Sequence, residues 1–457
     1  MTYNLSLFIF RRDFRLDDNV GLINALSSSN SVIPIFIFTP EQLTNNKYKS
    51  NNCVQFMIES LEDLDKQLKL RKSRLFYFFG QPAKIIDTIL ANQNIDAVFV
   101  NQDYTPYSIN RDYEIDDICK KYNIDFNSYE DILLNPVASI LTGDNKVYTK
   151  FTPYLNKALA KIVPKPLPNK YDNYLSYKTK IKNEFNRNIH DFYNYNDKLA
   201  VIGGRNNALN ILQNIKGFKN YNEERNYLNI ETTRLSAYNK FGCISIREVY
   251  HAVKNKIGIN SDLIKQLYWR DFYYNVLYEY PDTLLKHTSF KDRLNNLQWN
   301  NDKLLNKWEN GMTGFPIVDA AMRELNTTGY MHNRGRLIVA SFLVKTLRIN
   351  WKLGEAYFAK NLVDYDPAQN VGNWGWILQS LDSAGYTRIF NPWRQSKKYD
   401  KDCEYIKKWI PELENIQISD IHKWNEKYIG YSNINYPKPI VDYQKEKQKT
   451  INVYKKS

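Results

Sequence analysis

Residues 232–236, Thr-Thr-Arg-Leu-Ser, place three hydroxyl groups and one guanidinium directly before a stretch with helical periodicity. Hydroxyls, backbone N–H groups and an arginine at the start of a helix form an anion site that suits a phosphate or pyrophosphate. Because Ser and Thr also cap helices, the cluster taken alone is better explained as a capping cluster.

Two carboxylates stand two residues apart, at Asp364 and Asp366. They are compatible with a metal pair, with a catalytic pair, or with acceptors for the N–H and hydroxyl groups of a ligand. No histidine is nearby, which disfavours a metal. Arg334 and Arg336 lie upstream, so a carboxylate–guanidinium pair is a further, structural interpretation.

Donors and aromatic rings gather at three more places. Residues 329–336 end in Asn333 and Arg334 at the start of an apolar helical stretch, where they could contact a base and a phosphate. Trp269-Arg270 and residues 373–376, Asn-Trp-Gly-Trp, set aromatic faces beside polar groups. Stacking platforms of this type bind unpaired bases, although each Trp on its own is better explained as a core residue.

The charge balance favours a polyanionic partner. Lys and Arg number 63 and Asp and Glu 49, a formal net charge of +14, which suits nucleic acid and, less well, an anionic membrane surface. A composition rich in Lys, Asn, Ile and Tyr explains the same number as base-composition bias. Charge alone is therefore a weak indication.

The sequence contains no pattern typical of a membrane, secreted or metal-binding protein. No apolar run approaches the roughly 20 residues of a membrane helix, and the amino terminus lacks the order of a signal peptide. The four cysteines are scattered and form no CxxC, which fits a reducing intracellular compartment, nucleus or cytoplasm. We expect a monomer without a metal site and without a membrane partner.

The first 130 residues alternate strand and helix patterns. Apolar runs at 5–10, 32–38, 74–79 and 97–100 are separated by helical patterns at 55–70 and 82–92, and a further helix is expected at 108–122. Buried strands separated by helices predict a doubly wound α/β domain with a parallel sheet over residues 1–130. Neither GxGxxG nor a Walker motif is present, so an ordinary dinucleotide or nucleoside triphosphate site is not predicted here.

The rest of the chain has a different character. Residues 131–195, with three prolines close together, are interpreted as an interdomain linker, and residues 196–435 as an all-helical domain. Helices are expected at 245–255, 263–280, 316–325 and 334–347, and all nine Trp fall after residue 268. Residues 436–457 are expected to form a frayed basic tail.

Taken in series, seven strings resemble the photolyase/cryptochrome flavoproteins, most closely the cyclobutane pyrimidine dimer photolyases. They lie at residues 10–19, 232–236, 266–273, 314–323, 329–336, 364–376 and 390–392, so the resemblance spans nearly the whole chain. It implies an α/β domain of the antenna type followed by an all-helical domain that holds FAD, which is active as reduced FADH⁻.

The resemblance also assigns the FAD contacts. It implies that residues 232–236 (Thr232, Thr233, Arg234, Leu235 and Ser236) bind the FAD phosphates, with Tyr221 as an additional contact. Asp364 and Asp366 match the acids around the flavin ring and ribose, and Arg336 matches the arginine that pairs with the first of them. Asn370 matches the residue facing flavin N5. Positive charge and hydrogen bonds beside the ring are what a reduced, anionic flavin requires.

Three tryptophans match the family's electron-transfer chain from the flavin to the surface: Trp374, Trp351 and Trp299. Only a fold can align residues so far apart in sequence, so this assignment comes from the resemblance alone. We expect Trp374→Phe to slow light-driven reduction of the flavin.

The resemblance further implies blue-light repair of UV-damaged DNA. The excited FADH⁻ gives one electron to a flipped-out pyrimidine dimer, which splits and returns it. The lesion pocket and outer DNA contacts match Gln266, Trp269, Arg270, Asn333, Arg334, Trp376, Arg225 and Gln395.

Two positions depart from the cyclobutane-dimer pattern, since Gln266 replaces a usual Glu and Leu337 a usual Met. Gln at the first position is more typical of (6-4) photolyases and animal cryptochromes. The histidine pair of (6-4) enzymes is missing, because Asn333 and Leu337 occupy those positions. The alternatives are a cryptochrome-type blue-light photoreceptor, a DASH-like enzyme that prefers single strands, and a (6-4) photolyase. The short stretch after residue 413 disfavours the photoreceptor, which usually carries a long extension.

A second, antenna chromophore is possible in this family. Its contacts in relatives fall near residues 101–107, and the polar pair that holds a folate appears here as Tyr107-Ser108. A folate is therefore doubtful, and a deazaflavin, another flavin or no antenna remain alternatives.

Overall fold

The structure is a computed structural model that describes residues 2–44, 48–286, 288–290, 294–295, 297–381 and 388–456. The chain folds into two compact units. The first comprises Met1–Tyr195, Val201–Lys219 and Arg234–Pro281, and the second comprises Asn196–Ala200, Asn220–Thr233 and Asp282–Ser457. Part of the helical half of the sequence therefore belongs to the unit that contains the sheet.

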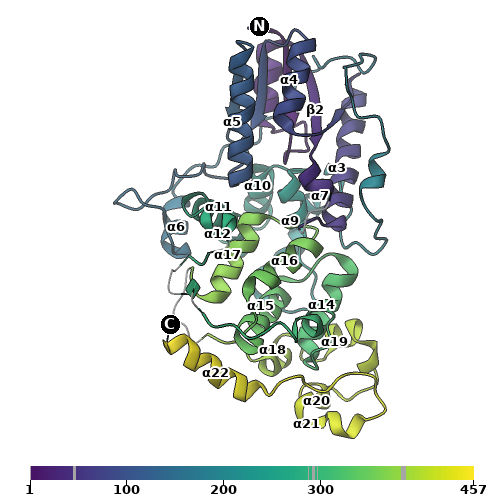
Figure 1. The fold of residues 1–457 in the computed structure, drawn as a ribbon, viewed down its shortest axis with the longest axis vertical. Helices are drawn as coiled ribbons and strands as arrows, with labels where there is room; N and C mark the ends of the chain where they lie inside the picture. The colour runs from purple at the N-terminus through teal and green to yellow at the C-terminus, as the bar shows by residue number, and fades with distance from the viewer. Residues whose placement is uncertain are drawn as a thin grey trace. The chain divides into compact units, whose positions relative to one another are not determined.

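The first unit is built on a five-stranded parallel sheet with strand order β3-β2-β1-β4-β5. The sheet, with its strand β2 labelled, lies close to the amino terminus in Figure 1. Its strands are β1 (Tyr3–Phe10), β2 (Ser29–Phe38), β3 (Phe76–Phe79), β4 (Ala97–Asn101) and β5 (Asp125–Tyr129). The order reverses between β1 and β4, which makes the sheet doubly wound, as predicted. β5 was not predicted, because this edge strand is polar and half-exposed and lacks the apolar run of a central strand.

Helices of this unit cover the sheet through alternating side chains. Leu7 and Ile9 of β1 share one buried cluster with Ile86 of α4 (Pro82–Asn92) and Ile115 of α5 (Pro106–Lys121). α1 (Val20–Ser28) contacts β1, β2 and β4. The remaining helices of the unit are α2 (Pro40–Leu43), α3 (Asn51–Leu70), α6 (Phe151–Ala158), α7 (Arg205–Gln213), α9 (Leu235–Phe241), α10 (Ile246–Lys256) and α11 (Asp262–Glu279), with the short η1 (Ile189–Phe192) and η2 (Ile215–Phe218).

Buried ion pairs attach α10 to the loop after β1. Arg247 of α10 bonds the carboxylates of Asp18 and Asp131 at 2.9 and 2.8 Å, and Arg15 also pairs with Asp131. These pairs are nearly inaccessible to solvent, so removing one partner would leave a buried charge uncompensated. Much of the string at 10–19 therefore has a structural function, and α6 and η1 give regular structure to part of the predicted linker.

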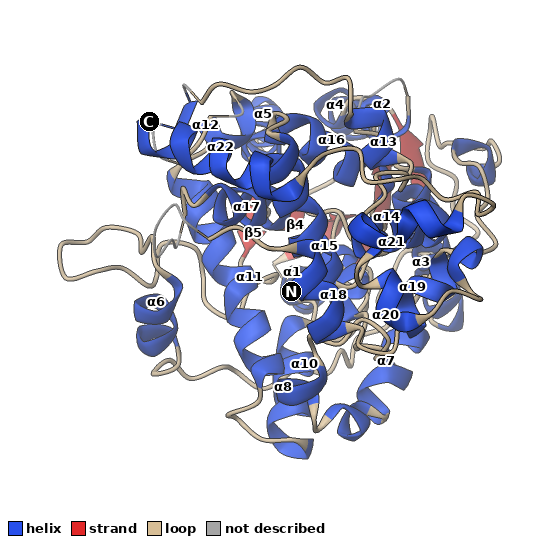
Figure 2. Ribbon diagram, turned by 90° about the horizontal axis from the view of Figure 1, so that it is seen from below, coloured by secondary structure: helices blue, strands red, loops and turns tan. Residues whose placement is uncertain are grey.

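The second unit is helical in its described residues, as the ribbon coloured by secondary structure also shows (Figure 2). Its helices are α8 (Tyr221–Glu224), α12 (Asp282–Leu285), α13 (Leu305–Glu309), α14 (Pro316–Thr328), α15 (Asn333–Ser341), α16 (Trp351–Asn361), α17 (Pro367–Leu378), α18 (Pro392–Tyr399), α19 (Glu404–Trp409), α20 (Ile418–Ile421), α21 (Trp424–Lys427) and α22 (Tyr443–Lys456). The helix expected at 334–347 is α15 continued by a π-helical segment, η4 (Phe342–Leu347). Two short 3₁₀ turns, η5 (Pro411–Leu413) and η6 (Tyr428–Tyr431), lie near the carboxyl end.

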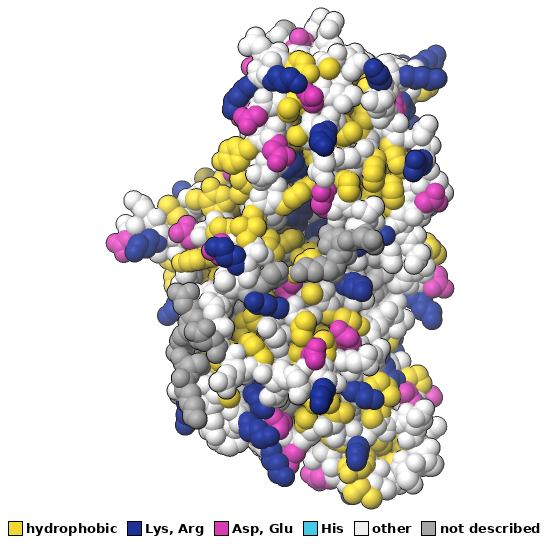
Figure 3. Space-filling view, viewed as in Figure 1, with side chains coloured by type: hydrophobic (Ala, Val, Ile, Leu, Met, Phe, Trp, Pro, Cys, Tyr) yellow, Lys and Arg dark blue, Asp and Glu magenta, His cyan; other side chains and the backbone are white. Residues whose placement is uncertain are grey.

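The carboxyl-terminal segment is helical, which corrects the expectation of a frayed tail. α22 packs against η4, where Thr450 donates a hydrogen bond to the carbonyl of Lys345 and Arg348 pairs with Glu446. Its outer face keeps the predicted basic character, and Figure 3 shows Lys and Arg side chains gathered there. No helix among the described residues is both long enough and apolar enough to span a membrane.

Candidate functional site

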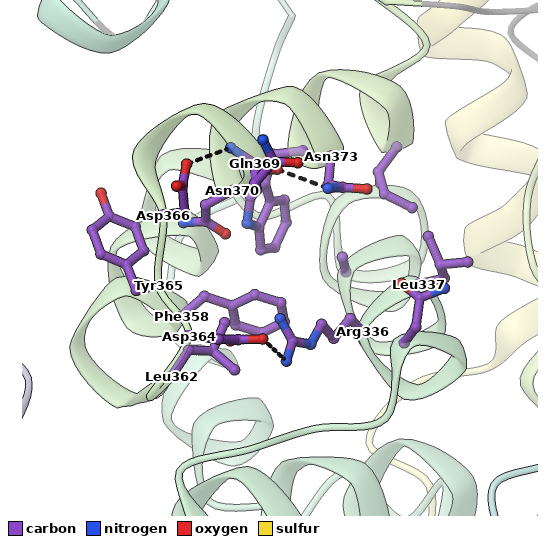
Figure 4. A pocket seen from close by; sticks show the side chains of 14 residues that line it. Arg336, Leu337, Phe358, Leu362, Asp364, Tyr365, Asp366, Gln369, Asn370 and Asn373 are labelled. Atoms are coloured by element: carbon purple, nitrogen blue, oxygen red, sulfur yellow. Dashed lines mark hydrogen bonds and ion pairs between the residues drawn. The ribbon is translucent and has the colours of Figure 1, made fainter. Parts of the chain in front are cut away.

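A cavity opens between three helices of the second unit (Figure 4). Its walls come from α15, α16, α17 and the turn at 362–366. The lining residues are Asn333, Arg336, Leu337, Ala340, Phe358, Leu362, Asp364, Tyr365, Asp366, Gln369, Asn370, Asn373, Trp374 and Ile377. Apolar walls with a few converging polar groups are typical of a site for a small organic ligand.

Local capping positions the polar groups. Asp366 is the N-cap of α17, and its side chain accepts from the backbone N–H of Gln369 at 3.2 Å, ahead of Pro367 at the first helical position. His332 caps α15, since its Nδ1 accepts from the N–H of Arg334. Both helices thus begin beside the cavity, and their first turns point polar side chains toward it.

An ion pair crosses the cavity between Arg336 and Asp364. Nη2 of Arg336 lies 2.9 Å from Oδ2 of Asp364 (Figure 4). Nε of Arg336 donates to the carbonyl of Met331. Burial opposes the charge of Arg336, but the Asp364 carboxylate, together with Tyr330 and Glu324, more than compensates and raises the pKa of the guanidinium. Oδ1 of Asp364 is buried without a hydrogen-bond partner among the described residues, so it remains available to a ligand in the cavity.

The opposite wall holds Asn370 in one orientation. Its Nδ2 donates to the carboxylate of Glu355 at 2.9 Å and to the backbone carbonyl of Glu355 at 3.1 Å. Glu355 is fully buried. Because both amide hydrogens are used on the protein side, the side-chain oxygen of Asn370 is the group left for a ligand.

A polar chain leads from the cavity to the first two residues of the 232–236 cluster. The Arg336 guanidinium lies 5.2 Å from the centre of the Tyr330 ring, and the Tyr330 hydroxyl is 3.4 Å from Oγ1 of Thr232. Burial raises the pKa of Tyr330. Thr232 and Thr233 are half-buried, and Tyr221 begins α8.

The last three residues of the cluster belong to the first unit. Arg234 is the left-handed N-cap of α9, with φ of 51°, Leu235 is buried and Ser236 is exposed. The helix start predicted after the cluster is therefore present.

The second unit also contains a basic and aromatic group of residues, in which two arginine side chains lie over aromatic rings. The Arg334 guanidinium lies 4.4 Å from the Tyr399 ring centre, and Arg388 lies 4.8 Å from that of Trp376. Burial lowers the pKa of Arg334, and the charges of Arg225 and Arg388 act in the same direction. Oε1 of Gln395 is buried without a partner among the described residues. Arginines held on aromatic rings suit phosphates and unpaired bases.

Three residues expected at the DNA interface lie in the first unit, on α11. Gln266 is half-buried, and Trp269 stacks on Phe151 with ring centres 3.7 Å apart. Arg270 is buried and donates to the carbonyls of Ile132 and Asn239. These contacts give Arg270 a structural role within its own unit.

The three tryptophans of the expected electron-transfer chain all lie in the second unit. Trp374 lines the cavity, Trp351 is the first residue of α16, and Trp299 is half-buried. Trp374 is also in T-shaped contact with Phe358, at 5.3 Å between ring centres.

Sequence reasoning missed several residues that the structure brings to these sites. Gln369 and Ile377 could have been found, because they follow the helical spacing of Asn370 and Trp374 on α17. Phe358, Glu355 and Arg388 carried no such signal, since their neighbours come from other elements.

Two family models match the chain. One, described as the FAD binding domain of DNA photolyase, matches residues 263–456, and another, described as DNA photolyase, matches residues 6–171. Together they contain the cavity and the parallel sheet.

Full-length relatives agree with these matches. A deoxyribodipyrimidine photo-lyase of Buchnera aphidicola is 33% identical and covers 99% of this chain and 97% of its own. The archaeal photolyase of Sulfolobus tokodaii, solved with two FAD molecules, has a TM-score of 0.88 at 37% identity, covering 99% of this chain and 100% of that one. A cryptochrome of Synechocystis has a TM-score of 0.89 at 26% identity, with 99% of both chains covered.

Proposed function

The chain belongs to the DNA photolyase family, and from this we propose that it splits cyclobutane pyrimidine dimers in UV-damaged DNA under blue light. The observation that carries the proposal is a cavity with an arginine–aspartate pair and a fixed asparagine, in the same unit as a basic and aromatic group. The names of full-length relatives support it, because they are deoxyribodipyrimidine photo-lyases.

The residues of the cavity fit a flavin. The unsatisfied Oδ1 of Asp364 can accept from a ring N–H, and Arg336 beside it supplies the positive charge that a reduced ring needs. Thr232, linked to the cavity through Tyr330, together with Thr233, Arg234, Leu235, Ser236 and Tyr221, would hold the phosphates. Asp366 would accept from the ribose hydroxyls.

FAD bound here, when reduced and excited by blue light, would supply the single electron that opens the dimer. Asn370 would present its side-chain oxygen to the ring, because Glu355 holds both amide hydrogens and fixes the orientation of the amide. Trp374, with Trp351 and Trp299, is proposed to return the flavin to the reduced state by light-driven electron transfer. The apolar wall around Phe358 and Trp374 excludes water from the same volume.

The basic and aromatic group is proposed to bind the lesion. Arg225, Arg334 and Arg388 would contact phosphates, while Trp376 and Tyr399 offer faces to unstacked bases. Asn333 begins α15 at the cavity, where a flipped base would arrive. Gln266 and Trp269 are proposed as further lesion contacts, and Gln395 as an outer contact.

The test uses an oligonucleotide with one thymine dimer, in single- and double-stranded form. The protein is loaded with FAD, reduced chemically with dithionite and illuminated with blue light, and restored thymines are measured by chromatography. A matched oligonucleotide with one (6-4) product and a dark sample are the controls. Recovery of thymines from the cyclobutane dimer, but not from the (6-4) product, supports the proposal. Recovery of no thymines in either single- or double-stranded DNA would favour a photoreceptor.

A second chromophore is proposed for the first unit. A pocket there is lined by Tyr104, Tyr113, Phe126 and four carboxylates, among them Glu130, whose pKa burial raises to about 7. The photolyase of Sulfolobus tokodaii holds two FAD molecules. Acid extraction of purified protein followed by chromatography should then release a pigment in addition to the FAD of the helical unit. One FAD per protein chain and no other pigment would contradict this proposal.

A further inference from the structure

Two asparagines mark the opening of the cavity in the second unit. Of the fourteen described residues that line it, Asn333 and Asn373 are the two that are exposed to solvent, and the others are buried or half-buried. Asn333 is the first residue of α15, and Asn373 lies in the middle of α17. A ligand that enters the cavity from solvent therefore meets two carboxamides, one from each helix.

Asn373 stands between the two groups that the proposed reaction brings together. It comes three residues after Asn370 and three before Trp376, which is a rise of about 4.5 Å along α17 in each direction. Gln369, Asn373 and Trp376 follow the i, i+4, i+7 spacing of one helix face. Gln369 and Asn373 line the cavity, and Trp376 lies under the Arg388 guanidinium. The cavity wall thus continues directly into the basic and aromatic group.

The basic and aromatic group connects the two helices at this opening. The Arg388 guanidinium lies 4.8 Å from the ring centre of Trp376 and 6.0 Å from that of Phe390. The Arg334 guanidinium lies 5.9 Å from the same Phe390 ring, and Arg334 directly follows Asn333 in α15. Each asparagine therefore has an arginine and an aromatic ring beside it, a combination that suits an unstacked nucleotide.

The carboxamide of Asn373 is held in one orientation against α17. Its Nδ2 donates to the backbone carbonyl of Gln369 at 2.7 Å, and Figure 4 shows the amide oxygen at the end turned away from Gln369. The backbone N–H of Gln369 donates in turn to Asp366 at the helix start. A base that arrives here meets a group whose direction is already set, which lowers the entropic cost of the contact.

We propose that Asn373 is a lesion-binding residue, which contacts the base edge of one pyrimidine of the dimer while Asn333 contacts the edge of the other. The proposal rests on the proposed function, because a dimer is a ligand that presents two pyrimidine edges at once. Each edge offers an N3–H donor beside a carbonyl acceptor. A carboxamide carries the matching oxygen acceptor and N–H donor, so one asparagine suits one edge.

The two asparagines together set specificity for the dimer. A single flipped base can engage one carboxamide, whereas two pyrimidines joined by a cyclobutane ring engage both. Undamaged DNA that is not flipped engages neither and depends on phosphate contacts alone. Loss of Asn373 should therefore lower the affinity for damaged DNA and leave the affinity for undamaged DNA unchanged.

The first measurement is binding in the dark by the FAD-loaded protein, followed by fluorescence anisotropy. We expect Asn373→Ala to bind an oligonucleotide with one thymine dimer about 10-fold more weakly, and the undamaged oligonucleotide as the wild type does. Asn452→Ala is the matched control, because Asn452 is an exposed asparagine of α22 with a side-chain partner four residues before it, and it should bind both as the wild type does. An unchanged flavin absorption spectrum in each variant shows that the FAD site is intact.

The second measurement assigns each asparagine to one base. Thymine dimers are prepared with an N3-methyl group on the 5′ or on the 3′ base, which removes the N–H donor of that base. The wild type should bind either one about 10-fold more weakly than the unmodified dimer. Asn373→Ala should lose its sensitivity to methylation of one base only, and Asn333→Ala should lose it for the other. The proposal is overturned if Asn373→Ala responds to both methylated dimers as the wild type does, or if its affinity for the unmodified dimer is unchanged.

Failure of this assignment is distinguishable from failure of the proposed function. If the reduced wild type splits dimers under blue light and Asn373→Ala binds them equally well, the role of Asn373 alone is refuted. If the wild type neither splits dimers nor prefers them over undamaged DNA, the function itself is refuted.

Discussion

The amide of Asn370 and the carboxylate of Glu355 are joined by a 2.9 Å hydrogen bond inside the wall of the cavity, where Glu355 has no exposed surface. The same amide also reaches the backbone carbonyl of Glu355 at 3.1 Å. Glu355, which does not line the cavity, thereby determines that the side-chain oxygen of Asn370 faces a ligand there.

Removing this carboxylate should loosen Asn370 and weaken FAD retention. We expect Glu355→Ala to lower the free energy of unfolding by about 1–3 kcal/mol, the usual cost of a lost buried hydrogen-bond partner. Glu355→Gln keeps an acceptor oxygen and should change stability much less. Urea denaturation and equilibrium dialysis with FAD measure both effects, and equal losses in the two variants would contradict the assigned role.

Gly354 is expected to tolerate no side chain. In Gly354→Ala the new Cβ would lie 2.3 Å from Trp374 and 2.5 Å from Leu343, so the indole must shift, at about 1–3 kcal/mol of stability. Gly430→Ala is the matched control, because a Cβ there meets nothing within 4 Å. Denaturation midpoints of the two variants give the comparison, and an unchanged midpoint for Gly354→Ala would show that the packing is looser than described.

Arg388 should contribute to DNA binding through a phosphate. Arg388→Ala is expected to weaken binding to dimer-containing duplex and to reduce the slope of log affinity against log salt by about 0.9, the value for one released counterion. Lys120→Ala, at an exposed lysine of α5, serves as the control and should leave the slope unchanged. Titrations by fluorescence anisotropy at several salt concentrations measure the slope, and identical slopes in both variants would place Arg388 outside the interface.

Asp271 of α11 should make stability depend on pH. Burial raises the pKa of its carboxyl to about 7, while its oxygens accept from the backbone N–H groups of Leu134 and Asn135. An unfolded Asp titrates near 3.9, so between about pH 4 and 7 the folded state binds the extra proton. Stability from this group is therefore fully present below that window and is lost as pH rises through it, by at most about 1.4 kcal/mol per pH unit.

The variant Asp271→Asn removes this titration. It is expected to be less stable than the wild type at low pH, where it loses one of two acceptor oxygens, and the difference should narrow toward pH 7. Urea denaturation at half-unit steps of pH gives the two curves. Glu130 titrates in the same range in both proteins and cancels in the difference. Parallel curves would mean that Asp271 is ionised throughout.

Local patterns in the sequence were sufficient to predict most of the helices and strands near the site. Apolar runs located four of the five strands, and helical spacing located α10, α11, α14 and α15 to within a few residues. Asp366 followed by Pro367 marks the start of α17, and Asn370 and Trp374, four residues apart on that helix, line one cavity. These features depend on neighbours within a few positions of the chain, so the order of residues carries them.

Only the tertiary structure decided which distant groups meet. The pair Arg336–Asp364 was expected from the upstream arginines, but the bond from Asn370 to Glu355 and the contact of Trp374 with Phe358 depend on how α16 packs against α17. β5 joins the sheet by edge pairing without an apolar run, and residues 234–281 belong to the unit of the sheet through contacts such as Arg247 with Asp18. Many faces of the helices and strands have a similar composition, so composition does not determine which of them pack together. The packing energy depends on the shapes of the two faces and on their buried polar partners, and no short stretch of sequence contains both.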